Sequence, residues 1–260
     1  MSELVGYLSL HFGTFLLVFV RIASLFISFP FFSTPFIPPN VKILLILALS
    51  FFLLPCVNTS VDLTHLSLLE LFLLFLKEAL TGIFLSLVAF VFYSVAIYAA
   101  ELVSYMMGLT VANMFDPTFG MVSVLGRFFV LLFYAVFFST GAYRVFIGAL
   151  FESFKVVPVG AFNLSEPLYR FFLKEGALLF LLSFKMAFPF ILALFITNLT
   201  LALINRLIPQ INVFIVGLPL QLFIGLFLLA VGFSALIYFT RGLVERFIEE
   251  FLTVFKLLGG

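Results

Sequence analysis

The chain has 260 residues, of which 65% are hydrophobic and only 10% are charged, and its formal net charge at pH 7 is +1. Soluble domains carry roughly 45–50% apolar and about 25% charged residues, so 13 basic and 12 acidic side chains cannot cover a water-facing surface of this size. The near-zero net charge also excludes the basic footprint of a nucleic-acid-binding protein, so lipid or an equally apolar partner must cover the exterior.

Six apolar segments follow one another along the chain. A helix that crosses the hydrocarbon core needs about 20 mostly apolar residues, and prolines separate or interrupt most of these stretches. The sequence therefore predicts an all-α polytopic membrane protein of about six kinked hydrophobic helices, at residues 4–29, 40–54, 66–114, 121–151, 167–205 and 212–239.

The third segment, 66–114, is too long for one crossing. At a rise of 1.5 Å per residue, an unbroken helix of that length measures about 70 Å, more than twice the hydrocarbon thickness. Either the helix breaks near Gly82 or Gly108, or much of it lies outside the bilayer. Small residues recur at every fourth position and predict close packing against a neighbouring helix, of this chain or of another subunit, at Ala96, Ala100, Ser104, Gly108 and Ala112.

The C-terminal tail, 241–260, differs from the preceding segments because it carries charges on one face. Apolar side chains follow helical spacing, and Arg241–Glu245 and Arg246–Glu250 are i,i+4 pairs on the opposite face. An amphipathic helix on the membrane surface or on a partner is one interpretation, and a terminal helix docked on its own bundle is the other. No linker or repeat divides the chain, so we expect a single domain over 1–260 with this tail at its end.

The chemistry of an enzyme is missing from the sequence. The chain has two histidines and one cysteine, and none lies at metal-ligand spacing from another ligand. No phosphate-binding Gly-Lys-Ser/Thr loop, nucleophile elbow or zinc-protease motif occurs. We therefore predict no catalytic residues, no cofactor and no metal.

Several charges fall inside apolar segments, where each costs about 2.5–3.5 kcal/mol at a helix centre on insertion scales. We expect Arg21, Glu101 and Arg206 to be buried and paired. Pairs across subunits suit an oligomer, whereas a path for protons or substrate suits a transporter. A third interpretation, in which the side chain extends to the membrane interface, fits Arg127 and Lys185 better than it fits Arg21.

Residues 115–120 join the third and fourth segments. Asp-Pro is a turn signal and the closing glycine permits positive φ, so a plain tight turn is one interpretation. The flanking aromatic residues favour a second, in which the loop is a hydrophobic plug or gate in a conduit. The candidate residues are Phe115, Asp116, Pro117, Thr118, Phe119 and Gly120.

The segment 208–221 interrupts an apolar stretch with prolines and amides. A broken helix at membrane depth is tolerated only where protein or a cavity satisfies the freed backbone groups. We expect a hinge or an inter-subunit packing element at Pro209, Gln210, Asn212, Phe214, Gly217 and Pro219.

These residues also carry a resemblance to a known family. Pro-Gln-Ile-Asn-Val-Phe at 209–214, followed by Gly-Leu-Pro at 217–219, resembles a signature of the FliR family of type III export-gate proteins. Further motifs resemble the family in the same order along the chain: Arg21 with Ser28 to Ser33 and Ile37-Pro38, Met107-Gly108, Asp116-Pro117 with Gly120, Glu152 to Phe154, and Val157 to Gly160.

The resemblance implies a non-enzymatic core subunit of a gated conduit that passes unfolded flagellar subunits across the bacterial cytoplasmic membrane, at the flagellar basal body. It implies FliP and FliQ homologues as partners in a hetero-oligomeric complex, with FlhB and FlhA associated. It also implies helical hairpins, kinked and partly raised out of the bilayer. Alternatives are an injectisome export gate, a secondary transporter that uses Arg21, Glu101 and Arg206, and a membrane scaffold without a conduit.

Overall fold

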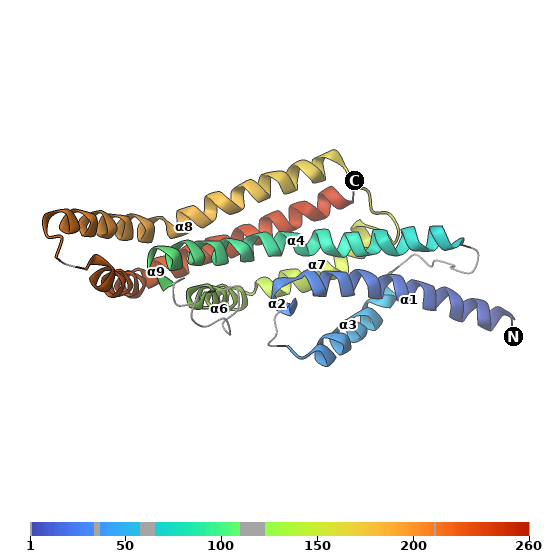
Figure 1. The fold of residues 1–260 in the computed structure, drawn as a ribbon. Helices are drawn as coiled ribbons and strands as arrows, with labels where there is room; N and C mark the ends of the chain where they lie inside the picture. The colour runs from blue at the N-terminus through green and yellow to red at the C-terminus, as the bar shows by residue number, and fades with distance from the viewer. Residues whose placement is uncertain (1, 34–36, 58–65, 110–122, 211, 260) are drawn as a thin grey trace. The chain divides into compact units, whose positions relative to one another are not determined.

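The computed structural model describes residues 2–33, 37–57, 66–109, 123–210 and 212–259, and every regular element within them is a helix. In chain order these are α1 (Ser2–Ser28), α2 (Pro30–Ser33), α3 (Pro39–Leu53), a 3-10 turn (Leu54–Cys56), α4 (Leu68–Met106), α6 (Val124–Ser139), α7 (Ala142–Val156), α8 (Glu166–Leu207) and α9 (Val213–Leu258), as Figure 1 shows. The predicted all-α membrane class is confirmed.

Helix boundaries follow local signals in the sequence. Pro30 ends α1 because its ring has no N–H to continue the ladder. At the start of α4, Ser67 and Glu70 form a reciprocal capping box, in which the Ser67 N–H donates to the Glu70 carboxylate over 2.8 Å. Ser123 caps α6 by accepting from the Gly126 N–H over 2.9 Å. Gly141, at φ 76°, separates α6 from α7.

The helix lengths do not match one bilayer thickness each. Three helices are long and apolar enough to cross a membrane, namely α4, α8 and α9 with 39, 42 and 46 residues, and α6 with α7 forms a bent fourth candidate within the described part. The 15 residues of α3 rise only about 22 Å, short of the roughly 30 Å hydrocarbon core. The sequence thus located the helices. Six is too high a count of helices that are long enough to cross the bilayer, since three or four of the described helices are.

Two helices are continuous where the sequence suggested a break. The sixth segment was expected to be broken, yet α9 continues through Pro219 and on into the tail, so residues 241–258 are the end of a long helix rather than a separate one. Helix α4 runs unbroken through Gly82 and ends at Met106, just before Gly108 at φ 74°. Pro219 is the seventh residue of α9, so it leaves the Ile215 carbonyl without its helical donor, yet the helix continues through it.

The chain divides into two compact units. Unit 1 comprises residues 1–91, 141–175 and 246–260, and unit 2 comprises 92–140 and 176–245, so α4, α8 and α9 contribute to both. In unit 1, α3 packs against α1, and the end of α9 buries Phe247 and Phe251, with Phe251 5.8 Å from Phe146 between ring centroids. The apolar face of the tail is therefore docked on the chain itself, while Arg241 and Glu245 pair over 2.9 Å on the exposed face.

Unit 1 depends on close approach of α1 and α4 at Gly82. A Cβ built at this position would meet the Ser24 side chain and the Arg21 carbonyl well inside van der Waals contact, and would lie 2.9 Å from the Leu25 nitrogen. Only a residue without a side chain lets the two backbones pass so closely.

We predict that Gly82→Ala lowers the melting temperature of the detergent-purified chain, because the added methyl forces α1 away from α4. Gly176→Ala is the matched control, since nothing lies within 4 Å of its Cβ position and alanine is the better helix former. Thermal unfolding followed by size-exclusion chromatography measures both, and an equal or higher melting temperature for Gly82→Ala would contradict the close crossing.

Candidate functional site

A buried ion pair between Arg21 and Glu78 lies at the centre of unit 1. Arg21 is 1% exposed and Glu78 is fully buried. The guanidinium Nε donates to Glu78 Oε2 over 2.6 Å and Nη2 donates to Oε1 over 3.1 Å, so the pair is bidentate. It joins α1 to α4 across 57 positions of sequence.

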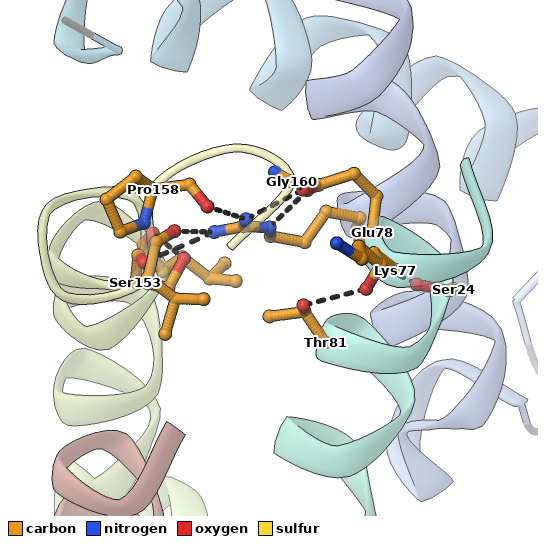
Figure 2. Close-up of polar contacts among 10 residues, drawn as sticks. Ser24, Lys77, Glu78, Thr81, Ser153, Pro158 and Gly160 are labelled. Atoms are coloured by element: carbon orange, nitrogen blue, oxygen red, sulfur yellow. Dashed lines mark hydrogen bonds and ion pairs between the residues drawn. The ribbon is translucent and has the colours of Figure 1, made fainter. Parts of the chain in front are cut away.

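The remaining guanidinium donors bind backbone carbonyls where α7 ends. Nη1 donates to the oxygens of Ser153 at 3.2 Å and Val157 at 2.9 Å, and Nη2 reaches the Pro158 oxygen at 3.5 Å. Figure 2 shows Ser153 and Pro158 facing Glu78 across this cluster. The Ser153 carbonyl also accepts from the Val157 N–H and the Pro158 carbonyl from the Ala161 N–H, so the guanidinium uses their second lone pairs. A cation is favourable at this place because the helix dipole is negative at the C-terminal end. The Phe154 ring lies 4.3 Å from the guanidinium carbon and covers one face.

The loop after α7 donates a further hydrogen bond to the carboxylate of Glu78. The Gly160 N–H donates to Glu78 Oε1 over 2.7 Å (Figure 2). Gly160 has φ of 79°, and a Cβ there would lie 3.0 Å from Leu74, so glycine suits both the backbone and the space. Lys77, next to Glu78 on α4, is exposed and takes no part in the Arg21–Glu78 pair.

The other two charges predicted to be buried lie in different surroundings. Glu101 is half-buried in unit 2, where its Oε1 accepts from the Ser123 N–H over 2.8 Å at the start of α6. Arg206 is exposed in the last turn of α8. It is not buried, because it stands where the helix ends at the turn to α9.

The structure also contains a buried carboxylate that the sequence reading did not single out. Glu175 on α8 is 1% exposed, and neither of its oxygens has a hydrogen-bond partner among the described residues. Charged side chains of Glu250, Arg246 and Lys174 act on it within unit 1. Little in the sequence signals this burial, because Glu175 directly follows Lys174 at the charged start of α8.

In unit 2, the motif segments at 107–108 and 217–221 come together. Gly108 stands where a Cβ would lie 2.6 Å from the Leu218 side chain, and a Cβ at Gly225 would lie 2.5 Å from the Met107 sulfur. Ala96, Ala100 and Ser104 are fully buried on α4, while Ala112 lies outside the described residues.

The hinge candidates surround the turn between α8 and α9. Pro209 and Gln210 are exposed in that turn, and Asn212 precedes α9, where its side chain accepts from the Ile215 N–H at 3.4 Å. Phe214 lies in the first turn of α9, Gly217 is buried and Pro219 is exposed. Nearby, Gln221 donates to the Asn198 side chain at the edge of a cavity of about 410 Å³. The gate candidates Phe115, Asp116, Pro117, Thr118, Phe119 and Gly120 lie outside the described residues.

The described residues thus form packing and pairing sites rather than a convergent catalytic site. No group of three or more metal-ligand side chains occurs among the residues searched. The arrangement can hold helices in register and present apolar faces to lipid or to another protein.

Known proteins match nearly the whole chain. The pattern of the bacterial export proteins, family 1, matches residues 12–247. A relative named flagellar biosynthetic protein FliR from Aquifex aeolicus is 37% identical over 94% of this chain and 92% of its own. The protein of the same name from Bacillus subtilis is 30% identical over 95% and 96%. Yop proteins translocation protein T from Yersinia pestis is 30% identical over 62% and 63%.

We predict that Glu78→Ala destabilises the chain by about 3–5 kcal/mol, because it leaves the Arg21 guanidinium buried without its counter-ion. Thermal unfolding in detergent is the measurement. Glu166→Ala is the control, since it breaks the Arg170 pair, whose side chains are 76% and 71% exposed, and exposed pairs contribute little. Equal melting temperatures for the two variants would contradict the central role of the buried pair.

A second prediction concerns Glu175. Because neither oxygen has a donor, Glu175→Gln replaces a buried carboxylate that has no hydrogen bond at nearly constant volume, and the melting temperature should stay equal or rise. Glu78→Gln makes the same substitution at a carboxylate that is paired and hydrogen-bonded, so it should lower the melting temperature. A large loss of stability in Glu175→Gln would show that the carboxylate has a partner in the isolated chain.

Proposed function

Because the chain belongs to the bacterial export proteins, family 1, we propose that it is a non-enzymatic subunit of the flagellar type III export gate in the bacterial cytoplasmic membrane. In this role it forms part of a gated conduit for unfolded flagellar subunits. Partner proteins that resemble FliP and FliQ assemble with it, and FlhB and FlhA associate with that core.

The observation that carries the proposal is the unequal burial of the three long helices. In the most apolar window of each, α4 is 61% buried by the chain itself, whereas α8 is 28% and α9 is 17% buried. Large residues stand free on α9, such as Phe223 at 67% and Val231 at 68% exposure. Apolar surface on this scale calls for lipid, partner helices or both.

Buried charges do not carry the proposal. We expected the polar groups inside apolar helices to be completed by sister subunits, but Arg21 and Glu78 complete each other within unit 1. Glu175 alone among the fully buried carboxylates of the described residues keeps both oxygens without a donor. It is the remaining candidate for a contact made on assembly.

The motif segments support a role in packing. Met107-Gly108 fit against α9 in unit 2, and the loop ending at Gly160 closes the ion pair in unit 1. We assign the segment 209–219 to contacts between subunits, because most of its described members are exposed. Gly217 and Leu218 also line a cavity to which Asn198, Asn205 and Gln221 contribute amide side chains. The loop 115–120 is assigned to the constriction of the conduit on its sequence alone.

The share of this chain that its relatives align with favours a flagellar role over an injectisome role. The flagellar relatives named above align with at least 94% of this chain, whereas the Yersinia pestis protein aligns with 62%. A secondary transporter that couples through Arg21 has little support, because the guanidinium donors are occupied by Glu78 and by backbone carbonyls.

The proposal is tested by co-expression with FliP-like and FliQ-like proteins of the same organism. We predict one stable complex in detergent by native mass spectrometry, because shared burial of α8 and α9 favours assembly. Recovery of this chain as a monodisperse free monomer, with the other two proteins expressed and folded, would contradict it. Omitting each partner in turn provides the matched controls.

A further inference from the structure

A single lysine interrupts the apolar part of α8. From Gly176 to Asn205 the only charged residue is Lys185, and the facing stretch of α9 from Val213 to Thr240 has none. Lys185 is exposed, and no hydrogen bond or ion pair joins it to any other residue that the structure describes. A cation in such surroundings requires an anion or water at its head.

The position of Lys185 along the helix fixes its depth. The uncharged stretch 186–205 contains 20 residues and rises about 30 Å, which equals the hydrocarbon thickness. Lys185 and Arg206 border it at the two ends. A longer window that includes Lys185 would put its ammonium into hydrocarbon, so the lysine belongs at the level of the lipid headgroups.

Side chains of the facing helix agree with this depth. Phe239 lines the same cavity as Lys185 and so stands at a similar level of the α8–α9 pair. Its neighbour Tyr238 is 81% exposed, and exposed tyrosines are typical of the membrane–water interface.

An apolar cavity of about 250 Å³ lies beside this lysine, between α8 and α9 in unit 2. Its wall includes Phe190, Val231 and Gly232, and Lys185 is its only charged lining residue. A Cβ at Gly232 would lie 3.9 Å from the Phe190 ring, which is ordinary van der Waals contact, so an alanine fits there and a longer side chain would extend into the cavity. Apolar cavities of roughly 150 Å³ take up benzene, so this one has room for a hydrocarbon guest.

Pro189 leaves a backbone carbonyl without its helical donor at the same place. It has no N–H, so the carbonyl of Lys185, four residues earlier, receives no bond from it within the helix. A hydroxyl near the lysine would find both a cation and a free acceptor there.

We propose that the groove between α8 and α9 binds one phospholipid, with its phosphate on the Lys185 ammonium and an acyl chain in the cavity. A partner helix with a carboxylate fits less well, since helices pack ridge into groove over a long contact, whereas this site offers one cation beside a partly open apolar pocket. The lipid also explains why cation and cavity occur together at headgroup depth. The inference rests on membrane insertion and not on the export role.

The probe is phosphatidylglycerol, added to the full-length chain in detergent and counted by native mass spectrometry. The wild-type protein should retain one lipid after delipidation, and Lys185→Gln should weaken its binding about tenfold, because a charge-assisted hydrogen bond is lost. Lys185→Arg should retain it. Lys174→Gln is the control, since it removes an exposed lysine from the same helix.

Two further arms separate the parts of the site. Gly232→Leu fills the cavity while keeping the charge, and it should also lose the lipid. Diacylglycerol, which lacks the phosphate, should bind weakly to the wild-type protein. Unchanged lipid retention in both Lys185→Gln and Gly232→Leu would overturn the proposal. So would a Lys185→Gln variant that keeps the lipid but loses a co-purifying polypeptide, because a partner carboxylate would then be the occupant.

Discussion

A guanidinium that cannot lose its charge must find a partner for each of its donors when it is taken out of water, and unit 1 is built around that requirement at Arg21. Glu78 supplies the counter-ion from α4, and the end of α7 and the residue after it supply backbone carbonyls. Gly82 and Gly160 make the approach possible, the first by removing a side chain between helices and the second by turning the loop. Charge and close packing therefore specify one arrangement of α1, α4 and α7.

Unit 2 has the opposite character. Its segments of α8 and α9 have a single charge between Gly176 and Asn205 and none between Val213 and Thr240, and most of their apolar surface stays outside the chain's own core. A helix pair of this kind is stable only with lipid or partner helices around it. The internal pairing of Arg21 with Glu78 in unit 1 and the exposed apolar faces of α8 and α9 in unit 2 support the proposal of a subunit that joins an assembly through these long helices.

Composition and hydropathy were enough to predict the helices, because apolar stretches bounded by proline leave few alternatives in a membrane. They could not predict that Glu78, rather than Glu101, meets Arg21, since that pairing depends on a contact 57 positions apart. Pro219 suggested a broken helix, yet α9 runs through it and through Arg241 with the loss of one backbone bond. Arg206 was expected to be buried from its apolar neighbours, yet it lies at a helix end, which hydropathy does not reveal. The motif segments pointed to residues such as Gly108 and Gly160, but they did not predict the contacts of these residues with Leu218 and Glu78.

The central claim is that protein partners cover part of the exposed face of α9, and in-cell photocrosslinking tests it most directly. A photoreactive residue replaces Phe223, which is 67% exposed, and a second replaces Leu236, which is 4% exposed, as the control. The account predicts a covalent adduct between position 223 and a second polypeptide of the export gate, and none from position 236. An adduct with lipid alone at position 223 and at other exposed positions of α8 and α9, in cells that assemble flagella, would contradict it.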